Sequence, residues 1–375
     1  MRYFQLDFLR GLMLVIMTVE HIKSPVSKLT NAPFGFFTSA MGFVFLSGLV
    51  AGIVAQNKSG KPNINLKEIY WKRSYLIFKY HLATFFIIYI IGFAFYLNGI
   101  AFDIYENFDL ETPILTKITM AVLLLDKPKY LDILPMYFVF IFALPFIIYL
   151  VKEKKSIYLI LISGLIYILA QYFKLHQFQQ DLSGVTVLEF GGFDLLAWQF
   201  IFILGVVLGM LYEQGQLYFL KNKTLLLCSA VIILCTTIFR RPEFYTIIIS
   251  EGFAGSLNHF IGANLRNFGA LNLIQLSNFL CFSLLMFNLI QFNIIKLTNK
   301  WLTLLGQHSL QVFTFHIFLS YLALMLRENL FPVLSGRIFF LLEMTITVFC
   351  LAALFIFVNY RSKKITNKKL AFIPK

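Results

Sequence analysis

The chain has 375 residues, of which 59% are apolar and only 13% carry a charge. Because soluble proteins have roughly 25% charged residues, this composition excludes an ordinary soluble domain. The net charge of +14 would suit a nucleic-acid-binding protein, but the basic residues are spread over the loops between apolar segments, which argues against that class.

Hydrophobic runs long enough to cross a bilayer recur along the whole sequence. They predict an all-α, polytopic membrane protein with about ten transmembrane helices. The runs are 6–22, 35–56, 75–97, 133–151, 156–173, 193–212, 224–239, 270–294, 302–326 and 337–358. We expect a single transmembrane domain over 1–358 and a short basic cytoplasmic tail over 359–375. No small-residue cleavage site follows the first run, so we interpret it as a retained signal anchor.

The loop charges predict the orientation. With the N-terminus inside, the cytoplasmic loops hold 19 of the 32 Lys and Arg residues, and the outer loops hold 11. The outer loops also hold 12 of the 18 acidic residues. Because cytoplasmic loops of membrane proteins are enriched in Lys and Arg, both termini are predicted to be cytoplasmic.

The first segment contains the strongest functional signal, Arg10 and His21. Eleven residues make about three helical turns plus 20°, so the two side chains share one face, roughly 16 Å apart along the axis. Ionisable residues at membrane depth are expensive and indicate function. His21, near the outer end, could act as a general base toward a hydroxyl, or could be an interfacial histidine bonded to a carbonyl. Arg10 could bind an anionic or carbonyl group, or pair with Asp7.

Glu20 precedes His21 and therefore points about 100° away from it. It needs a partner on another helix, or it faces water. In the second segment, Gly48 and Gly52 are four residues apart, and this spacing favours close approach of a neighbouring helix. The basic loop that follows contains Trp71, Lys72 and Arg73. These residues could anchor the chain at the membrane surface, or form a cytoplasmic phosphate site in which Trp71 stacks on a base.

The outer loop 98–132 is acidic and ends near Asp132, and Asp194 is expected at a similar depth. This surface could bind a carbohydrate or could simply be solvated. Further along, His308, Ser309 and His316 are candidate substrate-binding residues. The two histidines are separated by about 80° and 12 Å on a helix, so they cannot easily share a metal. The four cysteines all fall in apolar runs, and we expect no metal site.

These residues carry a family resemblance. Arg10 and His21 are followed, in order, by four further motifs at 42–52, 131–137, 196–199 and 308–313. Over residues 1–326 the chain resembles the OpgC family, which succinylates osmoregulated periplasmic glucans, within the membrane acyltransferase-3 superfamily. The resemblance implies a ten-helix enzyme of the bacterial inner membrane. Such an enzyme moves an acyl group, succinyl in OpgC, from cytoplasmic acyl-CoA to an extracytoplasmic glycan.

The resemblance also implies roles for single residues. His21 would be the catalytic histidine, Arg10 its essential partner, and Glu20 the carboxylate before the histidine, where Asp is more usual. Arg73, with Lys72 and Trp71, would contact the CoA moiety, although the usual Arg-x-x-Arg spacing is absent from this chain.

We therefore expect a membrane O-acyltransferase with His21 as general base. Acyl-CoA, with succinyl-CoA the donor that the resemblance indicates, would be a co-substrate, and no cofactor would be bound permanently. The expected partners are a glycan acceptor and membrane lipid, with no nucleic acid. The alternatives are a transporter or flippase, which would also place Arg and His on a path through the membrane, and an assembly protein with a vestigial site.

Overall fold

The computed structural model describes residues 3–61, 64–97, 113–185, 191–241, 255–256, 261, 269–330 and 336–371. Most of the acidic residues of the predicted outer loop 98–132, those in 98–112, lie outside the described residues. The described part is helical and contains no strand. All-α architecture is therefore confirmed.

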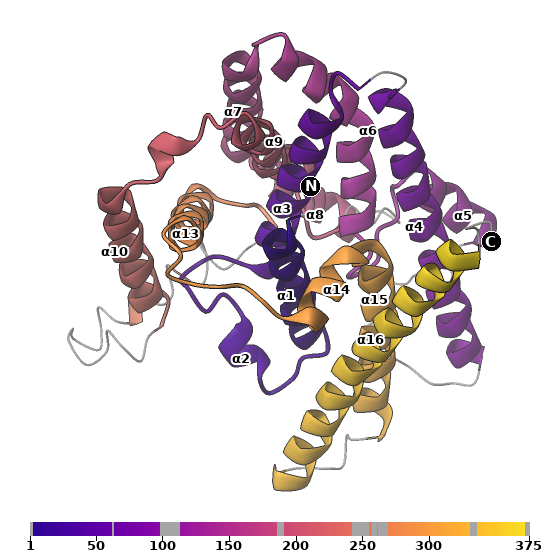
Figure 1. Cartoon of the computed structure of the whole chain (residues 1–375). Helices are drawn as coiled ribbons and strands as arrows, with labels where there is room; N and C mark the ends of the chain where they lie inside the picture. The colour runs from indigo at the N-terminus through magenta and orange to yellow at the C-terminus, as the bar shows by residue number, and fades with distance from the viewer. Residues whose placement is uncertain are drawn as a thin grey trace.

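The helices follow the order of the hydrophobic runs (Figure 1). They are α1 (Phe4–His21), α2 (Ser27–Thr30), α3 (Ser39–Lys58), α4 (Leu66–Leu97), α5 (Ile114–Val122), α6 (Ile133–Lys152), α7 (Ser156–Tyr172), α8 (Leu175–Val185), α9 (Leu195–Glu213), the 3-10 turn η2 (Tyr218–Leu220), α10 (Lys223–Arg240), α13 (Leu273–Gln291), α14 (Lys300–Gln307), α15 (Ser309–Leu330) and α16 (Gly336–Ala371).

Eight of the described helices, α3, α4, α6, α9, α10, α13, α15 and α16, are long and apolar enough to cross a membrane. The shorter α7 is also apolar, and α1 has 18 residues but carries charged side chains. Each predicted run except 302–326 thus corresponds to one helix, as expected of a multi-pass membrane protein. α16 continues past residue 358, so the basic tail begins as an extension of this helix.

One predicted segment, 302–326, is wrong as a single helix. The chain leaves helical geometry at His308, where φ is −109° and ψ is 29°, and this residue separates α14 from α15. α14 packs against α1, and α15 also contacts α1. The break therefore gives one hydrophobic run two different contacts with the first helix.

Glycines set the closest helix contacts. A Cβ atom on Gly48 or Gly52 of α3 would overlap with the carbonyls of Phe202 or Val206 of α9, and two glycines of α9 face α3 in the same way. The predicted close approach at Gly48 and Gly52 is confirmed. Small residues allow such contacts between helices that pack in lipid.

Glycines also allow close contact between α1 and α14. Gly11 of α1 lies against the carbonyl of Leu302, and Gly306 of α14 lies against the carbonyl of Asp7. Only hydrogen atoms separate the two backbones at these points. This contact fixes the height of α1 relative to the start of α15, which places Arg10 beside Ser309.

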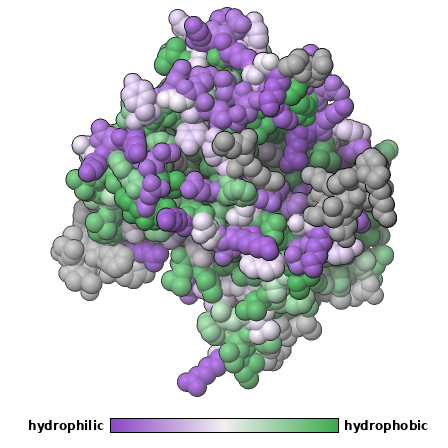
Figure 2. Space-filling model, in the orientation of Figure 1, coloured by the Kyte–Doolittle hydropathy of each residue, from purple (hydrophilic) through white to green (hydrophobic). Residues whose placement is uncertain are grey.

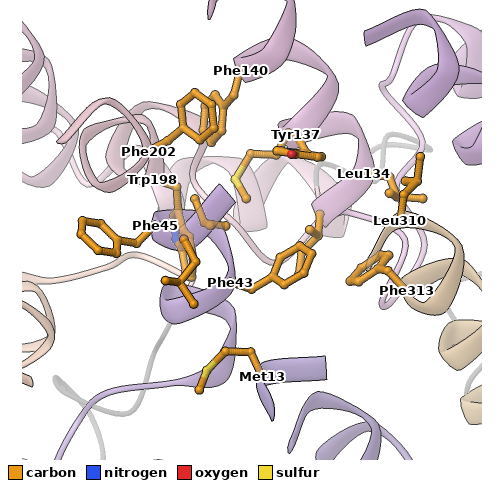
Figure 3. Close-up of a cluster of buried hydrophobic side chains, with 14 of the residues drawn as sticks. Met13, Phe43, Phe45, Leu134, Tyr137, Phe140, Trp198, Phe202, Leu310 and Phe313 are labelled. Atoms are coloured by element: carbon orange, nitrogen blue, oxygen red, sulfur yellow. The ribbon is translucent and has the colours of Figure 1, made fainter. Parts of the chain in front are cut away.

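The core lies where α3, α6, α9 and α15 meet. Figure 3 shows Phe43, Tyr137, Phe202 and Phe313, one from each of these helices, among the clustered buried side chains. In Figure 1, α10 and α13 stand to one side of this core, and α16 runs along α14 and α15. In Figure 2, hydrophilic residues gather over the upper and middle part of the visible face, whereas hydrophobic residues predominate toward the lower part and the left.

Candidate active site

His21, the last residue of α1, lies between two other rings. Its Nδ1 is 3.1 Å from Nε2 of His316 on α15. On another side, the ring of Tyr130 stacks on it, with centroids 4.1 Å apart and planes inclined by 22°. His316 is completely buried, and His21 is half-buried. The helix end thus presents an imidazole that keeps some access to its surroundings while its partner histidine lies inside the protein.

Tyr130, in the loop before α6, was not predicted from the sequence. Its φ of +70° lies in the left-handed region, which is uncommon for a residue other than glycine. The hydroxyl of Tyr321, on α15, donates to the carbonyl of Lys129, 2.7 Å away, and so ties this loop to α15. Burial raises the pKa of Tyr130 to about 12, so its hydroxyl is neutral near pH 7. Its position directly before the 131–137 motif is the one signal that could have indicated it.

Arg10 and His21 lie on the face of α1 that contacts α15, as the helical spacing predicts. Nη2 of Arg10 donates to Oγ of Ser309, 2.5 Å away, at the start of α15. Ser309 is buried. The two polar residues of α1 therefore contact two polar residues of α15, the first pair at Ser309 and the second at His316.

Glu20 turns away from His21. Its Oε2 accepts a hydrogen bond of 2.8 Å from the hydroxyl of Ser39, the first residue of α3. Of the two alternatives that the sequence left open for Glu20, the structure shows the partner on another helix. This contact joins α1 to α3 and gives the carboxylate a structural position beside the site.

The structure brings His316, but not His308, to His21. His308 stands at the junction of α14 and α15, near Ser309 and thus near the level of Arg10. Across the described ranges, no group of three or more His, Cys, Asp or Glu side chains is arranged to hold a metal ion.

Asp132 and Asp194 are both buried, and both accept hydrogen bonds from backbone N–H groups. Oδ2 of Asp132 accepts from the N–H of Gly192, 2.7 Å away. Burial raises the pKa of Asp132 to about 6, although the Gly192 hydrogen bond and the charge of Lys127 act in the opposite direction. Asp194 caps α9 by accepting from the N–H of Leu196 at 2.8 Å, and burial raises its pKa. The Asp132 carboxylate thus holds the loop at Gly192, and the Asp194 carboxylate caps the first turn of α9.

The three residues assigned to CoA lie at or near the start of α4. The indole of Trp71 stacks on Phe142 of α6, with centroids 5.6 Å apart, and Nζ of Lys67 lies 4.4 Å from the indole centroid. Lys72 pairs with Glu68 on the surface, 2.5 Å away. Arg73 is half-buried. The ring of Trp71 is therefore already stacked within the protein.

A shallow polar cavity, widely open to its surroundings, lies at the same end of the molecule, before the first turn of α4. Lys61 and Lys152 line it, together with Ile64, Asn65 and Leu66. The sequence interpretation missed these two lysines as a pair, because they are 91 positions apart in the chain. Their charges make this cavity the best-placed site for an anionic group near α4.

A second cavity, of about 370 Å³, is lined mostly by apolar side chains of α1, α3, α9 and α13. Its α1 lining includes Leu6, Leu9 and Met13, which are offset around the helix from Arg10 by about 40°, 100° and 60°, all in the same direction. The apolar cavity therefore lies beside the face of α1 that makes the polar contacts with α15.

Comparison with known proteins identifies the family. A family model described as OpgC protein matches residues 2–364, nearly the whole chain. Searches of curated proteins and of solved structures found no match. Membership of this family suggests a glucan-modifying acyltransferase. The order of motifs along the chain and the match of the family model agree, and the chain belongs to the OpgC family.

Proposed function

We propose that the protein is a membrane O-acyltransferase that moves a succinyl or related acyl group from cytoplasmic acyl-CoA to a hydroxyl of an extracytoplasmic glycan. It would act in a bacterial inner membrane, with both termini in the cytoplasm. The observation that carries the proposal is the pair of polar contacts between α1 and α15, Arg10 with Ser309 and His21 with His316. These contacts support a mechanism in which a base and a cation would lie along one path through the membrane core.

The chemistry assigned to His21 is general base catalysis. An unprotonated ring nitrogen of His21 takes the proton of the glycan hydroxyl as its oxygen attacks the thioester carbonyl. The carbon–oxygen bond forms, the carbon–sulfur bond breaks, and the proton on His21 passes to the departing CoA thiolate. An imidazole can both take up and release a proton at a ring nitrogen, which suits both halves of this transfer.

The donor would enter from the cytoplasmic side. Lys61 and Lys152, which line one cavity, would hold the CoA phosphates through charge-assisted hydrogen bonds. Arg10, roughly 16 Å below His21 along α1, would contact the carbonyl groups of the extended pantetheine arm. Because the cation and the base are about half a membrane apart, a donor that contacts both must be long and must lie along α1.

The test uses purified protein in lipid nanodiscs with succinyl-CoA, acetyl-CoA for comparison, and periplasmic glucans as acceptor. We expect CoA release that depends on the glucan, together with a mass increase of the glucan by one or more acyl groups. A transporter or flippase would move the glycan without releasing CoA, and an assembly protein would do neither. Absence of CoA release and of glucan acylation with both donors would contradict the proposal.

A further inference from the structure

His316 is a buried histidine that faces the proposed base, His21, through one of its two ring nitrogens. The side chain is completely buried. Nε2 faces His21 at 3.1 Å, whereas Nδ1 makes no hydrogen bond of normal geometry with any described residue. The ring of Phe313 packs edge-on against the His316 ring, with centroids 4.9 Å apart. The imidazole is thus held in place by packing on its own helix.

The contact between the two rings allows two arrangements when both are neutral. In one, Nδ1–H of His21 donates to Nε2 of His316, which leaves Nε2 of His21 without a proton. In the other, Nε2–H of His316 donates to Nδ1 of His21, which leaves the proton of His21 on its own Nε2. Only the first arrangement gives His21 a free Nε2 that can act as a base, because the hydrogen bond made by one ring nitrogen decides the state of the other.

The need of His21 to accept a proton separates the two arrangements. In the first, Nε2 of His21 is free to take the proton, and Nε2 of His316, 3.1 Å from Nδ1 of His21, remains the acceptor for Nδ1–H throughout. In the second, Nε2 of His21 already carries a proton and Nδ1 is occupied by the hydrogen bond from His316, so His21 can take no proton without losing that contact. The first arrangement is therefore the one that suits a base.

We propose that His316 is a positioning residue that holds His21 with its proton on Nδ1, so that Nε2 of His21 is the base. The inference rests on the proposed function and goes beyond it by naming the reactive atom and the residue that selects it. When Nε2 takes the proton of the acceptor hydroxyl, His21 becomes an imidazolium. Its Nδ1–H then makes a charge-assisted hydrogen bond to Nε2 of His316. His316 remains neutral and exchanges no proton.

Tyr130 and Lys129 face His21 from the loop before α6, and neither can replace His316. Tyr130 contacts His21 through its ring face, which offers stacking but no hydrogen-bond acceptor for Nδ1–H. Nζ of Lys129, 5.8 Å from the Tyr130 centroid, carries only donors. Among the described residues around His21, His316 is therefore the acceptor that fixes its tautomer.

The first test compares two variants of His316 with a control on the same helix. The amide oxygen of His316→Gln can still accept from Nδ1–H, whereas His316→Leu cannot. The control is Ser320→Ala, because Ser320 is equally buried but its hydroxyl bonds only to the His316 carbonyl. Succinyl transfer to periplasmic glucan is measured per folded molecule, with kcat and KM for succinyl-CoA determined separately.

We expect His316→Leu to lower kcat by about 10–100-fold, the usual cost of losing the partner that orients a functional histidine. KM for succinyl-CoA should stay unchanged, His316→Gln should keep most of the activity, and Ser320→Ala should resemble the parent. Full activity in His316→Leu, or equal losses in the Leu and Gln variants, would overturn the inference. Normal activity in His21→Ala would instead overturn the proposed function itself, so the two failures are distinguishable.

A second measurement does not depend on the variants of His316 folding. Nitrogen-15 spectra of ring-labelled histidine in bilayers report which ring nitrogen carries the proton, and His21→Ala identifies the signals of His21 among the six histidines. At a pH where His21 is neutral, we expect its proton on Nδ1. A proton on Nε2 of His21 in the parent protein would contradict the assignment directly.

Discussion

The candidate site consists of single residues on one face of α1 and their contacts with other elements. The eleven-residue spacing placed Arg10 and His21 on one face, and the structure confirms that face as the one toward α15. The contact of His21 with His316 and Tyr130 was not predicted. Helical periodicity fixes directions within one helix, whereas contacts between helices depend on how far each is shifted along its neighbour, which no spacing within the chain encodes.

The pKa of Asp132 yields a prediction about stability. Because burial raises this pKa from 3.8 to about 6, the folded protein holds this proton more tightly than the unfolded chain does. The charged carboxylate therefore costs stability, with no cost below pH 3.8 and the full cost above about pH 6. A change of about two pKa units corresponds to about 3 kcal/mol.

Asp132→Asn should remove this cost and still accept from Gly192 through its amide oxygen. We expect the variant to melt at a higher temperature than the parent at pH 7 and at the same temperature near pH 4, as measured in detergent. A difference in Tm that does not change between pH 4 and pH 7 would show that Asp132 does not titrate in this range.

Among the elements, the contact between α1 and α14 is the one that the sequence did not reveal. The run 302–326 is hydrophobic on both sides of His308, so hydropathy alone indicated a single helix. The break follows from packing, because Gly306 brings α14 onto the backbone of α1 near Asp7. By contrast, close approach of a neighbouring helix to α3 was predicted, since Gly48 and Gly52 are spaced one turn apart on a single helix, and the structure shows that this neighbour is α9.

A matched pair of glycine substitutions tests the α1–α14 contact. Gly11→Ala places a methyl group on the carbonyl of Leu302, whereas in Gly164→Ala, within α7, the new methyl group would meet only Phe200, at an ordinary 3.6 Å. Both changes raise intrinsic helix propensity by about 1 kcal/mol. Overpacking usually costs about 1–3 kcal/mol, so Gly11→Ala should lower Tm while Gly164→Ala leaves it equal or raises it. Equal effects on Tm would mean that the helices do not meet at Gly11.

The basic cavity before α4, lined by Lys61 and Lys152, gives a prediction about the binding of succinyl-CoA. Replacing Lys61 and Lys152 together with Ala should weaken binding of succinyl-CoA, because two charge-assisted phosphate contacts of about 1.5–3 kcal/mol each are removed. Lys72→Ala is the control, since Lys72 is already paired with Glu68 on the surface. Calorimetric titration with succinyl-CoA measures both. If Lys72→Ala lowered the affinity for succinyl-CoA more than the double variant does, the CoA site would lie at residues 71–73 and not at the basic cavity.

At the scale of the whole molecule, the sequence predicted the helical class well because hydropathy reports each apolar helix independently of the others. The orientation in the membrane rests on the loop charges and stays a prediction. A reporter enzyme that is active only in the cytoplasm, fused after Lys375, should be active, and one that is active only in the periplasm should be silent. The opposite result would invert the topology and move His21 to the cytoplasmic side, where a periplasmic glycan cannot reach it.

The central claim is that His21 performs the chemistry, and one measurement tests it most directly. It is the amount of acylated glycan per unit of membrane-inserted protein, for His21→Ala against the parent. We predict that insertion is unchanged and that the ratio falls by about 10²–10⁴-fold, the usual contribution of a positioned general base. A ratio near one would show that His21 is not the base and would contradict the mechanism.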